Sequence, residues 1–178
     1  MAKKTTGPRE ALLVIDMLND FCLEGAPLYV PSTGDVIPNI ARELKRAREA
    51  GTPVIYVCDA HVRDDPEFAY WPPHALAGSD GAMVVDELAP LPGEVVIEKT
   101  TLSCFHGTRL PGALRKARIS TLTVTGCVTE ICVLMTVFEG MTRGFRVRVI
   151  KDCVAGLTQQ MHEFALREME EVLKAEVI

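Results

Sequence analysis

The stretch from Leu122 to Cys132, LTVTGCVTEIC, joins an apolar, β-prone run to a helix-prone segment through one glycine. Short continuous apolar runs around Val124 are typical of strands that are buried on both faces of a sheet. Gly126 permits a tight turn, and Glu130–Arg143 then follows a helical period until Gly144. A strand, a glycine turn and a helix in this order begin a βαβ unit, which predicts a parallel sheet.

The same alternation of strand-like and helix-like segments extends along the whole chain. Further helices are expected at Val36–Ala50, Leu110–Ala117 and Gln159–Lys174. Strands are expected at Ala11–Ile15, Val54–Cys58, Val95–Ile97, Leu122–Thr125, Val147–Ile150 and Glu176–Ile178. The pattern predicts an α/β fold with three α/β/α layers around a mainly parallel sheet of about six strands.

Length, charge and cysteine content limit the class of protein. The 178 residues suffice for one domain spanning 1–178, and 19 basic against 24 acidic residues give a net charge of −5. This balance argues against a nucleic-acid partner, and no apolar run reaches the roughly 20 residues that cross a membrane. The six cysteines form no CxxC pair and follow no signal peptide, so a cytoplasmic protein is expected.

Charged side chains follow two of the predicted strands. Ligand sites of open α/β sheets lie beyond the carboxyl ends of the strands, so these positions are candidates for chemistry. Asp16 directly follows the first strand and is either a turn residue or a general base. Lys99 ends the third strand and is either a surface charge or a cleft residue beside Asp16, where each group would stabilise the other's charged form.

Cys132 is a candidate nucleophile after the fourth strand. If Thr129 caps the following helix, Cys132 lies in the first helical turn, where the helix dipole lowers the pKa of a thiol. Free backbone amides in such a turn can stabilise an oxyanion. The alternative is that Cys132 is one more buried cysteine. The other histidines are less promising: His106 is expected in a loop and His162 on a solvated helix face.

The long segment from Asp59 to Glu94 carries possible metal ligands. Asp59 and His61 are two residues apart and point the same way in extended chain, and two prolines restrict the backbone before His74. The candidate ligands of a divalent ion are Asp59, His61, Glu67 and His74. Asp64 and Asp65 are expected on the solvated surface. The alternative is an acidic loop with chance histidines.

Together these residues resemble the isochorismatase-like cysteine hydrolases, and within them the nicotinamidases. The resemblance rests on Val14-Ile15-Asp16, Asp20-Phe21, Lys99 and Gly126-Cys127-Val128-Thr129-Glu130-Ile131-Cys132. It implies a catalytic triad of Asp16, Lys99 and Cys132. It also implies a cis peptide bond between Cys127 and Val128, with an oxyanion hole formed by the amides of Val128 and Cys132.

The segment DAH at 59–61 with WPPH at 71–74 looks like the metal site of the nicotinamidases. In that family the substrate ring lies between aromatic side chains, which correspond to Phe21 and Trp71. The resemblance therefore implies hydrolysis of nicotinamide to nicotinic acid and ammonia through a cysteine thioester. One divalent metal, zinc or otherwise iron or manganese, would orient this small aromatic amide, in a homo-oligomer.

Two departures from the family pattern concern the substrate. Many members have Gln where this chain has Leu18, and many nicotinamidases have Tyr near Leu102. The alternatives are therefore a metal-independent amidase or ureido-hydrolase of the same fold, and a non-catalytic binding protein.

Overall fold

The computed structural model describes residues 9–178 and contains a parallel sheet in the order β3-β2-β1-β4-β5-β6. Every strand pair is parallel, as the alternating pattern predicts. The strands are β1 (Arg9–Ile15), β2 (Val54–Asp59), β3 (Val95–Lys99), β4 (Ile119–Cys127), β5 (Arg146–Ala155) and β6 (Glu176–Val177). The order reverses between β1 and β4, and α/β sheets bind ligands beyond the carboxyl ends of strands at such a switch point.

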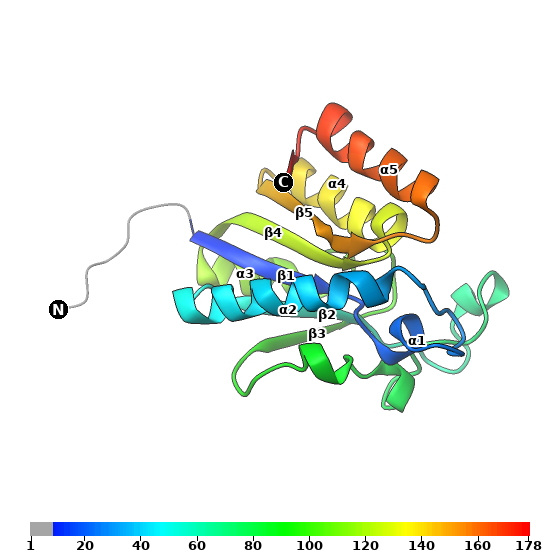
Figure 1. The fold of residues 1–178 in the computed structure, drawn as a ribbon. Helices are drawn as coiled ribbons and strands as arrows, with labels where there is room; N and C mark the ends of the chain where they lie inside the picture. The colour runs from blue at the N-terminus through cyan, green and yellow to red at the C-terminus, as the bar shows by residue number, and fades with distance from the viewer. Residues whose placement is uncertain (1–8) are drawn as a thin grey trace.

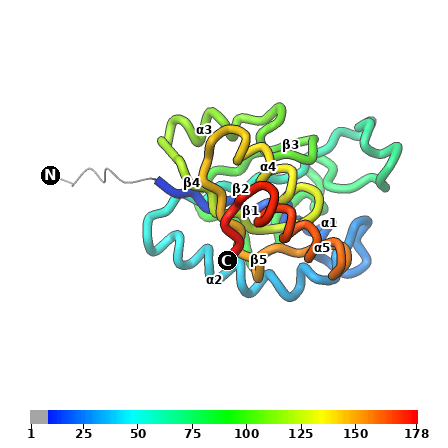
Figure 2. The backbone as a smooth tube through the Cα atoms, turned by 90° about the horizontal axis from the view of Figure 1, so that it is seen from above, coloured from blue at the N-terminus to red at the C-terminus, as the bar shows by residue number. Residues whose placement is uncertain are grey.

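Helices cover both faces of this sheet, which gives the expected three layers (Figures 1 and 2). The helices are α1 (Asn19–Cys22), α2 (Thr33–Ala50), α3 (Leu110–Ala117), α4 (Leu134–Thr142) and α5 (Gln159–Arg167). Leu13 and Ile15 of β1 pack in the core under α3, α4 and α5, whereas Leu12 and Val14 pack in the core under α2. Both faces of β1 are therefore buried, which explains its continuous apolar run.

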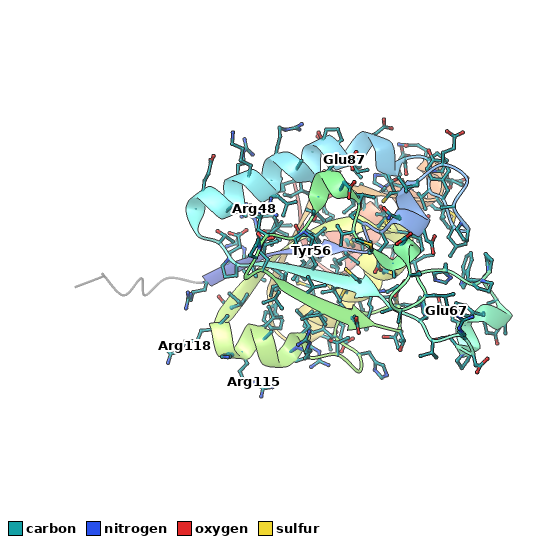
Figure 3. The ribbon with its side chains drawn as sticks, turned by 90° about the horizontal axis from the view of Figure 1, so that it is seen from below. Arg48, Tyr56, Glu67, Glu87, Arg115 and Arg118 are labelled. Carbon is teal, nitrogen blue, oxygen red and sulfur yellow. The ribbon has the colours of Figure 1, made fainter. Side chains whose placement is uncertain are left out.

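A polar network fixes α2 on its face of the sheet. Arg48 near the end of α2 donates to Glu94 at 2.8 Å and to the Tyr56 hydroxyl of β2 at 3.2 Å. Figure 3 shows Arg48 and Tyr56 next to each other beneath the helix. No helix within residues 9–178 combines the length and apolar character needed to cross a lipid bilayer.

The helix after β4 begins differently from the prediction. The capping position is Val128 and not Thr129, which is already the first residue of the helical turn, and the Thr129 hydroxyl pairs with Nδ1 of His162 at 2.9 Å. A π-helical turn, Thr129–Val133, precedes α4, and a second one, Glu168–Val172, follows α5. The expected solvated position of His162 is also wrong, since this residue is half-buried against the first π-helical turn.

Gly126 allows β4 to approach the end of β1 closely. Its φ is +117°, and a Cβ atom would lie 2.0 Å from the carbonyl oxygen of Ile15. The positive φ and the lack of space for a Cβ atom both occur where the chain turns from β4 toward Cys132. No residue type other than glycine therefore fits without moving the strand ends apart.

We expect Gly126→Ala to lower the free energy of unfolding by about 3 kcal/mol or more, because the new methyl group meets rigid backbone in an unfavourable conformation. Urea denaturation followed by circular dichroism measures the change. Gly112→Ala is the matched control: Gly112 lies in α3 with open space around it, so the fold should gain about 0.5–1 kcal/mol. Equal stability of Gly126→Ala and the original chain would contradict this account of the turn.

Candidate active site

A cavity of about 300 Å³ lies beyond the carboxyl ends of the central strands, beside the switch point. It brings together most of the side chains that the sequence singled out. Its lining includes Asp16, Phe21, Asp59, Glu67, Trp71, His74, Cys127, Val128 and Cys132. Lys99 and His61 are buried immediately behind this lining, in contact with Asp16 and Asp59. The strand-end positions therefore converge on one pocket.

Lys99 is buried between two carboxylates. Its Nζ atom lies 2.7 Å from Oδ2 of Asp16 and 2.5 Å from Oδ1 of Asp59. The same nitrogen lies 3.6 Å from Sγ of Cys132. Lys99 pairs in register with Asp59 on the neighbouring strand, and the amide of Asp59 donates to Asp16 at 2.8 Å. The ends of β1, β2 and β3 are thus joined around one ammonium group.

Burial and neighbouring charges set the ionisation of this group of side chains. Burial would lower the pKa of Lys99, but the negative charges of Asp16 and Asp59 outweigh it and raise that pKa well above its usual range. Burial and the repulsion by Asp59 raise the pKa of Asp16 to about 6, although Lys99 acts in the opposite direction. Lys99 is therefore a permanent cation beside a carboxylate that can take up a proton near neutral pH.

The thiol of Cys132 does not have the lowered pKa predicted from the helix dipole. Burial raises its pKa well above the usual value, and the attraction of Lys99 only partly offsets this. A carboxylate oxygen of Asp16 lies within 4.8 Å of the sulfur of Cys132, and the interaction with this thiol lowers the pKa of the carboxyl group. The thiol is consequently neutral at rest, and Asp16 is placed to remove its proton.

Three of the predicted metal ligands lie close together. Asp59, His61 and His74 each offer a ligand atom within 4.8 Å of the others. Nδ1 of His74 pairs with the carbonyl of Pro72 at 2.8 Å, which leaves its Nε2 for a metal. Nε2 of His61 is buried and has no hydrogen-bond partner within the described chain. An orphaned imidazole nitrogen facing a carboxylate fits a divalent cation.

The charges around His61 also favour a cation at this place. Burial lowers the pKa of His61, but the neighbouring carboxylates of Asp59 and Asp65 outweigh it and raise the pKa to about 9. The predicted surface position of Asp65 is wrong, since its Oδ2 lies 3.0 Å from Nδ1 of His61. Glu67 forms a second possible ligand group with His61 and Asp65, on the projecting loop of Figure 3.

Aromatic and polar contacts hold this loop over the cavity. Phe21 lies 5.5 Å from the His74 ring between centroids, and Trp71 stands at the rim with 39% of its surface exposed. The sequence did not point to Phe68, which packs against both His61 and His74. Asp20 accepts a hydrogen bond from the amide of Ala75 at 2.7 Å and so anchors the residue after His74.

The peptide bond between Cys127 and Val128 is cis, as the resemblance implies. The carbonyl of Asp16 accepts a hydrogen bond from the Cys127 thiol at 3.0 Å. The cis peptide bond therefore lies directly against the end of β1. Val128 and Cys132 both line the cavity, and their backbone amides belong to the turn that surrounds the thiol.

We expect Lys99→Met to cost about 3–5 kcal/mol of stability at neutral pH, because two buried carboxylates lose their counter-ion. The loss should shrink at low pH, where protonation removes the uncompensated charges. Urea denaturation between pH 5 and 8 measures both effects. Lys45→Met is the control, since Lys45 is exposed beside Glu49, and it should change stability by less than about 0.5 kcal/mol. A pH-independent loss would show that charge pairing is not the cause.

The curated proteins to which this chain is similar include amidases. The chain is 33% identical to an uncharacterized isochorismatase family protein, PncA, of Bacillus subtilis, over 95% of this chain and 98% of that protein. It is 36% identical to an N-carbamoylsarcosine amidase of Arthrobacter, over 86% of this chain and 63% of that protein. It is 31% identical to a maleamate amidohydrolase of Pseudomonas putida, over 92% of this chain and 80% of that protein.

Solved structures agree with this similarity. An isochorismatase-like hydrolase of Alkaliphilus metalliredigens superposes with a TM-score of 0.91 at 31% identity, over 95% of this chain and 93% of that one. A pyrazinamidase of Pyrococcus horikoshii in complex with zinc superposes with a TM-score of 0.89 at 30% identity, over 96% of this chain and 99% of that one. The family model described as the isochorismatase domain matches residues 10–178. The chain therefore belongs to the isochorismatase family of hydrolases.

Proposed function

We propose that this protein is a metal-dependent cysteine amidohydrolase that converts nicotinamide to nicotinic acid and ammonia. The buried group of Asp16, Lys99 and Cys132 supports amide hydrolysis, because it holds a thiol, a proton acceptor and a fixed cation in contact. The adjoining Asp59, His61 and His74 support a metal in the same cavity. Glu67 is the proposed fourth ligand.

The chain's own groups account for the first half-reaction, which forms the thioester and releases ammonia. Asp16 takes the proton of Cys132 while Lys99 balances the negative charges, and the sulfur attacks the amide carbonyl. Amides of Val128 and Cys132 donate to the developing oxyanion, an effect often worth about 2.7–4 kcal/mol per donor. Asp16 returns the proton to the departing ammonia, and water then hydrolyses the thioester. A divalent ion held by Asp59, Glu67, His61 and His74 would supply a Lewis acid that binds the pyridine nitrogen.

The charge of the cavity wall supports a neutral substrate. No Lys or Arg of residues 9–178 lines the cavity, whose charged groups are Asp16, Asp59 and Glu67. Apolar side chains such as Leu102 and Leu157 form much of the remaining wall. Maleamate and N-carbamoylsarcosine each carry a carboxylate, which would be desolvated here against an acidic and apolar lining that contains no Lys or Arg within residues 9–178. A neutral aromatic amide between Phe21 and Trp71 meets no such cost.

A panel of amides tests this proposal. We expect nicotinamide and pyrazinamide to exceed maleamate and N-carbamoylsarcosine by at least about 100-fold in kcat/KM, because an unpaired buried charge costs several kcal/mol. Ammonia release by the metal-replete protein measures each rate. Cys132→Ala is the control: it keeps the pocket and the fold but should release no ammonia from any substrate. Faster turnover of the anionic amides would assign the protein to another amidase class, and a fully active Cys132→Ala would remove the thiol from the mechanism.

Metal removal should affect substrate binding more than the chemical step. We expect the chelated protein and His61→Ala to show a KM for nicotinamide raised by about tenfold or more, since the ring loses its orienting contact. Steady-state kinetics after dialysis against a chelator measure this, and added zinc should restore only the original chain. An unchanged KM in protein shown to be metal-free by elemental analysis would favour the metal-independent alternative.

A further inference from the structure

We propose that Asp65 is a positioning residue that orients the proposed metal ligands His61 and Glu67. The inference rests on the metal site of the proposed function and goes beyond it to a residue outside the ligand set. Asp65 lies four positions after His61 and two before Glu67, on the loop that leaves β2. Its side chain is only 9% exposed, although its neighbour Asp64 is exposed.

Both carboxylate oxygens of Asp65 are used, and each one fixes a different ligand residue. Oδ2 lies 3.0 Å from Nδ1 of His61, and Oδ1 accepts a hydrogen bond from the amide of Glu67 at 2.9 Å. The amide of Asp65 in turn donates to the carbonyl of Val62 at 3.1 Å, which closes the turn between the two ligands. One side chain thus determines where both residues lie relative to the cavity.

The contact with His61 also determines which ring nitrogen can bind a metal. A carboxylate accepts but does not donate, so it selects the ring form that carries a proton on Nδ1. The lone pair is then on Nε2, the buried nitrogen that lies 3.8 Å from Oδ1 of Asp59 and has no hydrogen-bond partner in the described chain. A carboxylate behind an imidazole also makes it a stronger metal ligand.

A capping role alone would not need an aspartate. Asparagine or serine can also accept a hydrogen bond from the amide of Glu67, because these residues are good caps. Neither can do this and accept from Nδ1 of His61 as well: asparagine has a single acceptor oxygen, and the serine hydroxyl is too short to span both groups. Asp65→Asn and Asp65→Ser therefore separate the orientation of His61 from the shape of the loop.

The experiment compares zinc binding by the original chain, Asp65→Asn, Asp65→Ser and the control Asp64→Asn. Competition with a chromophoric chelator gives each dissociation constant, and thermal melting of the metal-free proteins shows whether the fold is kept. We expect both Asp65 variants to bind zinc about 10–100-fold more weakly and to melt near the original temperature. The Asp64→Asn control should bind within about twofold of the original chain, because solvated surface changes rarely matter.

Cobalt substitution adds a second measurement, the visible spectrum of bound Co²⁺, which a change in loop shape alone would not alter. The visible spectrum of bound Co²⁺ reports the ligands, so a loosened His61 should weaken and shift the bands of the Asp65 variants but not those of Asp64→Asn. Unchanged zinc affinity in folded Asp65→Asn and Asp65→Ser would overturn this inference and leave the metal site intact. Failure of the original chain to bind any divalent ion would instead overturn the metal site itself and the inference with it.

Discussion

One buried ammonium group holds the active site together. Lys99 contacts Asp16, Asp59 and Cys132, which come from the ends of β1 and β2 and from the turn after β4. Two neighbouring buried carboxylates such as Asp16 and Asp59 are tolerated only with a counter-ion between them. A buried lysine is likewise tolerated only with carboxylates around it. The adjacency of β3, β2 and β1 therefore serves the site as well as the fold, since it brings the ends of these three strands to the same edge of the sheet.

The fold follows from the apolar pattern of the chain because the central strands are buried on both faces. The runs around Leu13 and Val124 are continuous for this reason, and they predicted strands at the right places. The predicted boundaries were shorter than the observed ones where polar residues extend a strand, as in β5 from Arg146 to Ala155. The π-helical turn after β4 was not predicted; its first residue, Thr129, contacts His162, which lies 33 residues away in sequence.

The part of the candidate site that lies at the strand ends was predictable from the sequence. Asp16 and Lys99 meet because parallel strands end at the same edge of the sheet. The ionisation of Cys132 was not predictable, since burial raises the pKa of this thiol despite the attraction of Lys99, and burial depends on the whole fold. Asp65 and Phe68 were missed for a related reason: the loop that carries them is shaped by distant contacts such as Asp20 with Ala75.

In the proposed function, catalysis and the choice of substrate depend on different parts of this molecule. The thiol, its proton acceptor and the ammonium lie at strand ends, whose positions the sheet determines. The walls that meet a substrate come mainly from connecting segments, which place Leu28, Trp71, Leu102 and Leu157 around the cavity. Loops vary more readily than the elements they connect. Amidases that are 31–36% identical to this chain are named for different substrates, so under the proposed function the choice of substrate depends on these variable walls more than on the strand ends.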